Sequence, residues 1–102
     1  MNQCILIGYV KDEPKIKETS NGNRLTQIHL DVNRPYKNAE GNYDSDTFVV
    51  NLWNQMADEC VKTIEVGQML VIRGRLQSNN YERDGEILYR FEIVGEKVSA
   101  LA

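Results

Sequence analysis

The chain has 102 residues, of which 41% are hydrophobic, and its 15 acidic and 12 basic side chains give a formal net charge of −3. This length predicts a single domain over residues 1–102 with one modest core. No apolar run approaches the roughly 20 residues of a membrane span, and the N-terminus lacks the pattern of a signal peptide. We therefore expect a cytoplasmic protein. The acidic balance argues against nucleic-acid binding, because proteins that bind phosphate backbones are usually basic, at least locally.

The first third of the chain predicts two strands joined by a polar turn region. Residues 3–10 are apolar at nearly every position, which predicts a strand buried on both faces of a small barrel. Asn21-Gly22 is a strong turn signal. Residues 25–32 alternate, so Ile28, Leu30 and Val32 are expected on one face.

The middle of the chain predicts a long hairpin loop followed by a third strand. Residues 33–46 are polar and contain Pro35, which is typical of a flexible loop. Residues 47–53 return as a strand. Its alternation places Phe48 inward and Thr47 outward.

Residues 54–65 form the only good helix candidate. Asn54 is expected to be the N-cap, and Gly67 follows as a stop signal. Apolar residues recur at helical spacing and predict a buried face made of Met56, Ala57, Cys60, Val61 and Ile64.

The last third predicts two more strands, over residues 69–78 and 86–93, and a final apolar stretch over residues 94–101. A polar turn, Arg83-Asp84-Gly85-Glu86, joins the two strands. Alternation places Leu76, Tyr89 and Phe91 toward the core.

The element order is three strands, one helix and two strands, with no internal repeat. This order matches the all-β OB-fold, a five-stranded Greek-key barrel in which the helix lies between strands three and four. In that fold the long hairpin loops and one outer face bind oligonucleotides or oligosaccharides.

No residue pattern indicates catalysis, a metal site or a cofactor. Cys4, Cys60 and the single histidine, His29, are too few and too scattered for a zinc site. A disulfide between the cysteines is disfavoured in a cytosolic chain, so we expect both to be small buried apolar groups. His29 lies on an alternating strand without an obvious partner, and a surface or packing role explains it. We therefore expect a protein that is not an enzyme.

Aromatic residues next to cations are the remaining functional signal. Tyr36 lies between Arg34 and Lys37, and Tyr81 lies near Arg83 in a polar hairpin. Unpaired bases stack on such rings while cations follow the phosphates. Trp53 is expected on the outer face of the third strand.

Several segments in order resemble the bacterial single-stranded-DNA-binding protein family over nearly the whole chain. They are ILIGYVKDEPKIKETSNG, DVNRPYKNAEGNYDSD, the Gly67–Leu76 strand pattern with the Tyr81 hairpin, and the closing YRFEI. The resemblance implies sequence-independent coating of single-stranded DNA by a homotetramer, a dimer of dimers, associated with the nucleoid. It places Tyr36, Trp53 and Tyr81 at base-stacking positions. Arg73 and Arg75 fall on a face that contacts DNA or neighbouring subunits.

The sequence departs from this family at several positions. Thr47 stands where the family often has an outward aromatic, unless the strand is bulged. Asn79 and Asn80 stand where it usually has Arg or Lys, and Asp31 where it has a small residue. These changes predict weaker binding and a shallower salt dependence.

The family also usually carries a long disordered tail with an acidic tip, and the sequence stops at Ala102. A naturally short form is expected to coat DNA without recruiting replication and repair partners through such a tip. The alternative to the coating function is an OB-fold protein-interaction module, such as a primosome component, with weak DNA affinity.

Overall fold

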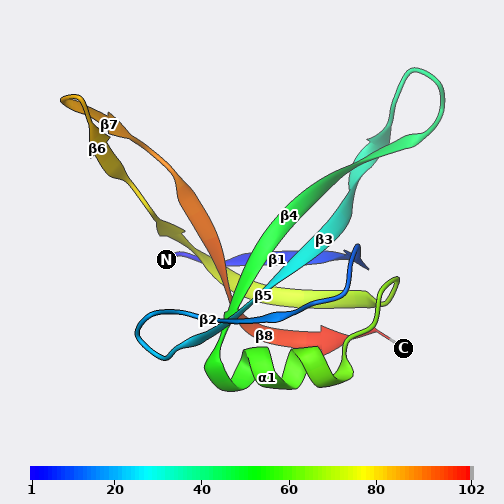
Figure 1. Cartoon of the computed structure of the whole chain (residues 1–102). Helices are drawn as coiled ribbons and strands as arrows, with labels where there is room; N and C mark the ends of the chain where they lie inside the picture. Colours follow the sequence, from blue (N-terminus) through cyan, green and yellow to red (C-terminus); the bar gives the residue numbers. More distant parts are fainter. Residues whose placement is uncertain (102) are drawn as a thin grey trace.

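The computed structural model describes residues 1–101. It contains a barrel, one helix and two hairpin arms (Figure 1). The elements in chain order are β1 (Cys4–Val10), β2 (Ile16–Glu18), β3 (Arg24–Lys37), β4 (Tyr43–Trp53), α1 (Asn54–Thr63), β5 (Met69–Ser78), β6 (Tyr81–Arg83), β7 (Glu86–Leu88) and β8 (Phe91–Ala100).

Five strands close the barrel in the order β1-β3-β4-β8-β5. β4 and β8 are parallel, and the other barrel neighbours are antiparallel. β2 pairs only with the outer edge of β3. The predicted OB-fold, with its helix between the third and fourth barrel strands, is confirmed.

The barrel interior is one hydrophobic cluster to which every barrel strand contributes. Alternation predicted its members correctly on β3 and β4, where Ile28, Leu30, Val50 and Leu52 are at most 1% exposed. Phe48 packs against the same cluster, as predicted. Leu70 and Ile72 complete it from β5.

α1 closes the end of the barrel opposite the two arms (Figure 1). Ala57 and Cys60 are buried, and Met56 and Ile64 pack beside them, as the apolar spacing predicted. The helix α1 has 10 residues. Within residues 1–101, no helix is long and apolar enough to cross a membrane.

The helix begins at residue 54 as predicted, but the predicted N-cap was wrong and the helix ends at Thr63 rather than near Glu65. Trp53, not Asn54, occupies the N-cap position, and its side chain makes no capping hydrogen bond. Asn54 has a φ of 53°, and its side-chain oxygen instead accepts a hydrogen bond from the backbone N–H of Arg24. The helix ends at Thr63, and Gly67 lies in the following turn, where its N–H donates to the carbonyl of Val10.

The predicted long loop over residues 33–46 is largely a paired hairpin, the β3–β4 arm. β3 continues to Lys37 and β4 begins at Tyr43, so only residues 38–42 connect the strands. The register between them shifts between Asn33 and Lys37. Pro35 lies in this irregular stretch, because a proline has no N–H to donate to a regular ladder.

A second hairpin, the β6–β7 arm, rises from the same end of the barrel and diverges from the first in a V (Figure 1). Asp84 and Gly85 have φ values of 53° and 79° at its tip. Two successive positive φ values are the requirement of a type I′ hairpin turn. The predicted turn at residues 83–86 is therefore confirmed.

Five exposed apolar positions contradict the predicted burial. Ile5 and Ile7 on β1 are 61% and 51% exposed, so that strand is buried on one face only. Tyr89 and Phe91 are 78% and 67% exposed, and Leu76 is 43% exposed. Leu76, Tyr89 and Phe91 lie where the chain leaves the barrel for the β6–β7 arm. The alternation pattern had assumed that the barrel core extends to these positions.

Candidate nucleic-acid interface

The β3–β4 arm presents aromatic rings beside cations. Tyr36 and Tyr43 are 61% and 55% exposed. The Nζ of Lys37 lies 5.8 Å from the centre of the Tyr43 ring. The arm thus offers flat apolar faces next to positive charge, which suits an unstacked nucleic-acid strand.

The β6–β7 arm repeats this arrangement. Tyr81 is 39% exposed, and the guanidinium carbon of Arg90 lies 4.4 Å from the centre of its ring. A cation therefore lies over the Tyr81 ring, at a distance in the range of a cation–π interaction. Arg83 is exposed near the tip.

Asn79 and Asn80 form the neck of this arm. The side-chain oxygen of Asn80 accepts a hydrogen bond from the backbone N–H of Arg90, 3.0 Å away. The N–H of Asn79 donates to the carbonyl of Arg90 at 2.8 Å. The two residues that replace the expected cations therefore fix the position of Arg90, which supplies a cation itself.

Sequence reasoning did not name Tyr89, Arg90 and Phe91 as candidates, and the structure places them exposed at the base of the β6–β7 arm. Their order is ring–cation–ring, which contains the same ring–cation pair as Tyr36-Lys37 and was an available signal. Strand alternation hid it, because the strand over residues 86–93 was assumed to stay on the barrel. The structure breaks that strand at residues 89–90.

A pocket of about 270 Å³ lies in the fork between the arms. β4 and β8 pair only at Val50–Ile93 and Asn51–Val94, and beyond these pairs the strands part. We call this the fork pocket. Its lining residues are Gln27, Thr47, Phe48, Val49, Asn51, Phe91, Glu92 and Ile93.

The position of Thr47 was predicted correctly. The β3–β4 register runs without a shift from Leu25 to Asn33, so no bulge turns another side chain outward. Thr47 is exposed and donates a 2.6 Å hydrogen bond to Asp31. The ring that the family often places here is absent from β4.

Trp53 is half-buried at the end of β4, two residues beyond Asn51 on the outer face. It pairs with Leu25 of β3. It is the last residue of β4, directly before α1, and does not lie on either arm.

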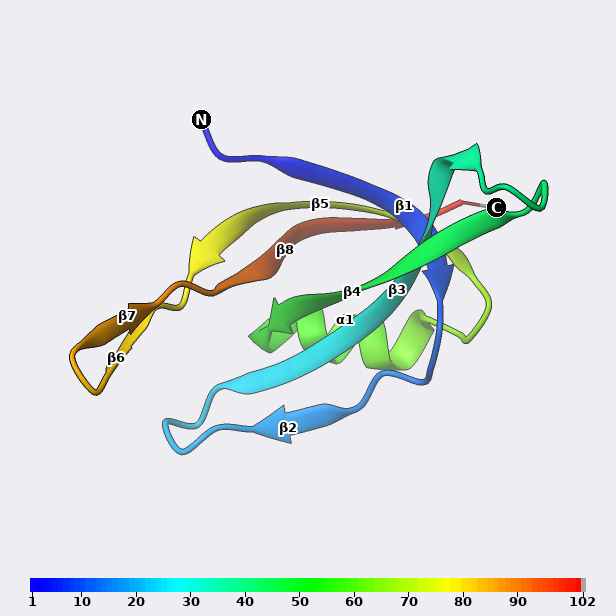
Figure 2. The same cartoon turned by 90° about the horizontal axis from the view of Figure 1, so that it is seen from above.

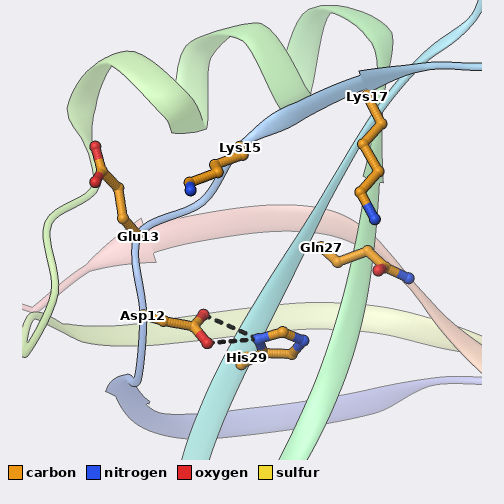
Figure 3. A pocket seen from close by; sticks show the side chains of 6 residues that line it. All are labelled: Asp12, Glu13, Lys15, Lys17, Gln27 and His29. Atoms are coloured by element: carbon orange, nitrogen blue, oxygen red, sulfur yellow. Dashed lines mark hydrogen bonds and ion pairs between the residues drawn. The ribbon is translucent and has the colours of Figure 1, made fainter.

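A second pocket of about 360 Å³ opens beside β3 and contains two lysines, Lys15 and Lys17 (Figure 3). The Nδ1 of His29 lies 2.9 Å from both carboxylate oxygens of Asp12. His29 is partly exposed, and its partner Asp12 was not apparent from the sequence because it lies 17 residues away. Gln27 lines this pocket and the fork pocket, so both open on one outer face.

Two predicted cations are already paired. Arg34 donates to both carboxylate oxygens of Asp46, at 3.2 and 2.9 Å. These hydrogen bonds hold the pKa of Asp46 below its usual range and raise that of Arg34. Arg75 lies 3.5 Å from Glu96 and also donates to Gln77.

Arg73 is not brought to the aromatic arms. It lines an apolar pocket with Ile5, Val71, Lys97 and Ser99. These residues belong to β1, β5 and β8, which lie on the other side of the barrel from β2, β3 and β4 (Figure 2). Of the predicted residues, Tyr36, Lys37, Arg34, Tyr81 and Arg83 lie on the arms.

Residues 1–101 match the sequence model of the Single-strand binding protein family. The chain belongs to this family. It is 30% identical over 102 residues to the single-stranded DNA-binding protein of Oceanobacillus iheyensis, covering 99% of this chain and 63% of that protein. Single-stranded DNA-binding protein 3 of Listeria innocua is 33% identical over 102 residues, which cover 99% and 64% of the two chains.

The fold of this family member also matches solved structures. The wild-type single-stranded DNA binding protein of Thermus aquaticus superposes with a TM-score of 0.82 at 24% identity, over 100% of this chain and 50% of that one. The likeness supports the OB-fold assignment. The chain spans less than two thirds of the length of these two relatives, and half of this structure.

Proposed function

We propose that residues 1–102 act as a single-stranded-DNA-binding domain that coats unpaired strands without reading their sequence, in replication, recombination and repair. The observation that carries this proposal is the V of exposed rings and cations on one end of the barrel. Base stacking is worth about 1–3 kcal/mol per base and tolerates any sequence. A domain that is acidic overall can therefore bind through stacking, with few phosphate contacts.

In this proposal the strand crosses from one arm to the other. Tyr36 and Tyr81 stack bases on the two arms, and Trp53 stacks a base on the outer face of β4. Lys37 and Arg83 neutralise phosphates, and Arg34 does so when it leaves Asp46. Binding of this kind involves no bond making, so we propose a protein that is not an enzyme.

Arg73 and Arg75 would contact a strand only if it wraps around the barrel. Their surroundings favour a second role, at a contact between subunits. Ile5, Ile7 and Tyr9 are exposed along β1, and Ile5 pairs with Arg73 of β5. Exposed apolar patches of this kind commonly mark protein interfaces.

The edge of β1 supports self-association. β1 pairs with β5 through Cys4–Tyr9 but with β3 only at Tyr9 and Val10. Within residues 1–101, the other edge of Cys4–Gly8 pairs with no strand. A second copy could extend the sheet there, and we propose a homotetramer built as a dimer of dimers. Light scattering coupled to gel filtration measures this mass, and a monomer at micromolar concentration would contradict it.

The DNA-binding proposal is tested by the anisotropy of a labelled oligo(dT), with duplex DNA of equal length as competitor. We expect saturable binding that duplex DNA does not displace. Tyr36→Ala and Tyr81→Ala should each weaken it. Ile87→Ala is the control, because Ile87 is 54% exposed on the β6–β7 arm but carries no ring.

The rival protein-interaction module predicts only weak binding of oligo(dT), which the ring variants would not change. The names of the relatives do not favour this alternative, and Tyr36 and Tyr81 are exposed on the two arms. We propose that the domain works in the cytoplasm, on the nucleoid.

A further inference from the structure

The fork pocket combines an exposed ring with a polar floor. Phe91 is 67% exposed at its rim. Because most of the Phe91 ring is exposed, packing against the barrel does not explain its position. Thr47 lines the same pocket from β4. Phe91 therefore presents a ring from β8 next to the position at which β4 lacks one.

The polar floor belongs to a short hydrogen-bond network across four strands, β3, β4, β8 and β5. Gln27 donates to the side-chain oxygen of Asn51 at 3.0 Å. Asn51, only 6% exposed, donates to one carboxylate oxygen of Glu92 at 2.9 Å. Gln77 donates to the other carboxylate oxygen at 3.3 Å. The side chains of Asn51 and Gln77 are neutral amides. They fix the orientation of the Glu92 carboxylate without adding a positive charge beside it.

Glu92 retains capacity to accept further hydrogen bonds. A carboxylate offers about four lone-pair sites, and the two amides use two of them. Within residues 1–101, Glu92 forms no ion pair with a lysine or arginine. A group that enters the pocket beside Phe91 therefore meets an oriented acceptor that repels phosphate and attracts an N–H donor.

We propose that the fork pocket is a nucleobase subsite, in which Phe91 stacks the base and Glu92 selects bases that carry an exocyclic amine. Cytosine presents its N4 amine as a donor at the position where thymine presents the O4 acceptor. The pocket should therefore favour cytosine over thymine at one position of an otherwise sequence-tolerant site. This inference rests on the proposed DNA-binding function.

The test compares oligo(dC) and oligo(dT) of one length at pH 8, by anisotropy, on the wild-type protein and on Glu92→Gln. A glutamine can donate as well as accept, so it should not discriminate between the two pyrimidines. We expect Glu92→Gln to reduce the preference for dC relative to dT by about fivefold, the low end of discrimination by a base contact. Glu65→Gln is the charge-matched control, because Glu65 lies just beyond α1, at the opposite end of the barrel.

Phe91→Leu tests the ring itself. It should weaken both oligonucleotides alike, with an unchanged melting temperature because Phe91 is exposed. An unchanged dC-to-dT ratio in Glu92→Gln, or the same change in Glu65→Gln, would overturn the role of Glu92. Unchanged affinity in Phe91→Leu would overturn the stacking role. Absence of binding by the wild-type protein to both oligonucleotides would instead refute the proposed function.

Discussion

Neutralising Asp46 should strengthen DNA binding by releasing Arg34. The two side chains are 42% and 41% exposed and joined by two hydrogen bonds. While Arg34 is held in this pair, it cannot displace counterions from a phosphate. In Asp46→Asn the partner charge is gone, and the guanidinium becomes free to contact the strand on the β3–β4 arm.

The size of this effect follows from counterion release. Each phosphate neutralised on single-stranded DNA adds about 0.7 to the slope of log K against log salt. One additional contact therefore steepens the slope by about 0.7 and raises affinity about fivefold at 0.1 M salt. The assay is oligo(dT) anisotropy over a salt series.

Asp44→Asn provides the matched control on the same arm. Asp44 accepts a hydrogen bond from the neutral amide of Asn38, so its loss changes the local charge without freeing a cation. We expect a smaller change in slope than for Asp46→Asn. Equal slopes in the two variants would refute the reasoning that Arg34 is a masked phosphate contact.

Three further predictions concern the arm, the thiols and acid stability. Tyr81→Ala should weaken oligo(dT) binding by about 1–3 kcal/mol with little change in melting temperature, since the ring is 39% exposed; a large loss of stability would make Tyr81 a packing residue. Burial raises the pKa of Cys60 to about 11, so iodoacetamide at pH 8 should label Cys4 first, and equal rates on the native protein would contradict this. Hydrogen bonds from Arg24 hold the pKa of Asp58 below its usual range. The ion pair therefore stabilises the fold above about pH 3.9, and this stabilisation is lost as the pH falls through the lower pKa of Asp58 in the folded state. Asp58→Asn should therefore lose less stability than wild type between pH 7 and pH 3 in urea unfolding, and an identical loss would refute the role of the pair.

The barrel was predictable because it depends on local signals. The alternation over residues 25–32, the helical spacing of Ala57 and Cys60, and the turn at Asp84-Gly85 each report a conformation of a few residues. The order of these elements then allows few folds. The β3–β4 arm was not predicted, because its strands are polar and exposed, and pairing there leaves no pattern of burial.

The site was harder to predict than the fold. The aromatic and basic pairs Tyr36 with Lys37 and Tyr81 with Arg83 were predicted because their members are close in the sequence. It did not find that Asp46, 12 residues from Arg34, neutralises that cation. It also placed Phe91 in the core, because alternation does not show where a strand leaves the barrel.

The most direct test of the account is the fluorescence of Trp53, the only tryptophan of the chain, during titration with oligo(dT). The account predicts saturable quenching at low salt, with a shallow salt dependence that reflects few phosphate contacts. Binding detected by anisotropy without quenching would remove Trp53 from the site. Absence of both quenching and binding would contradict the central claim that this domain coats single-stranded DNA.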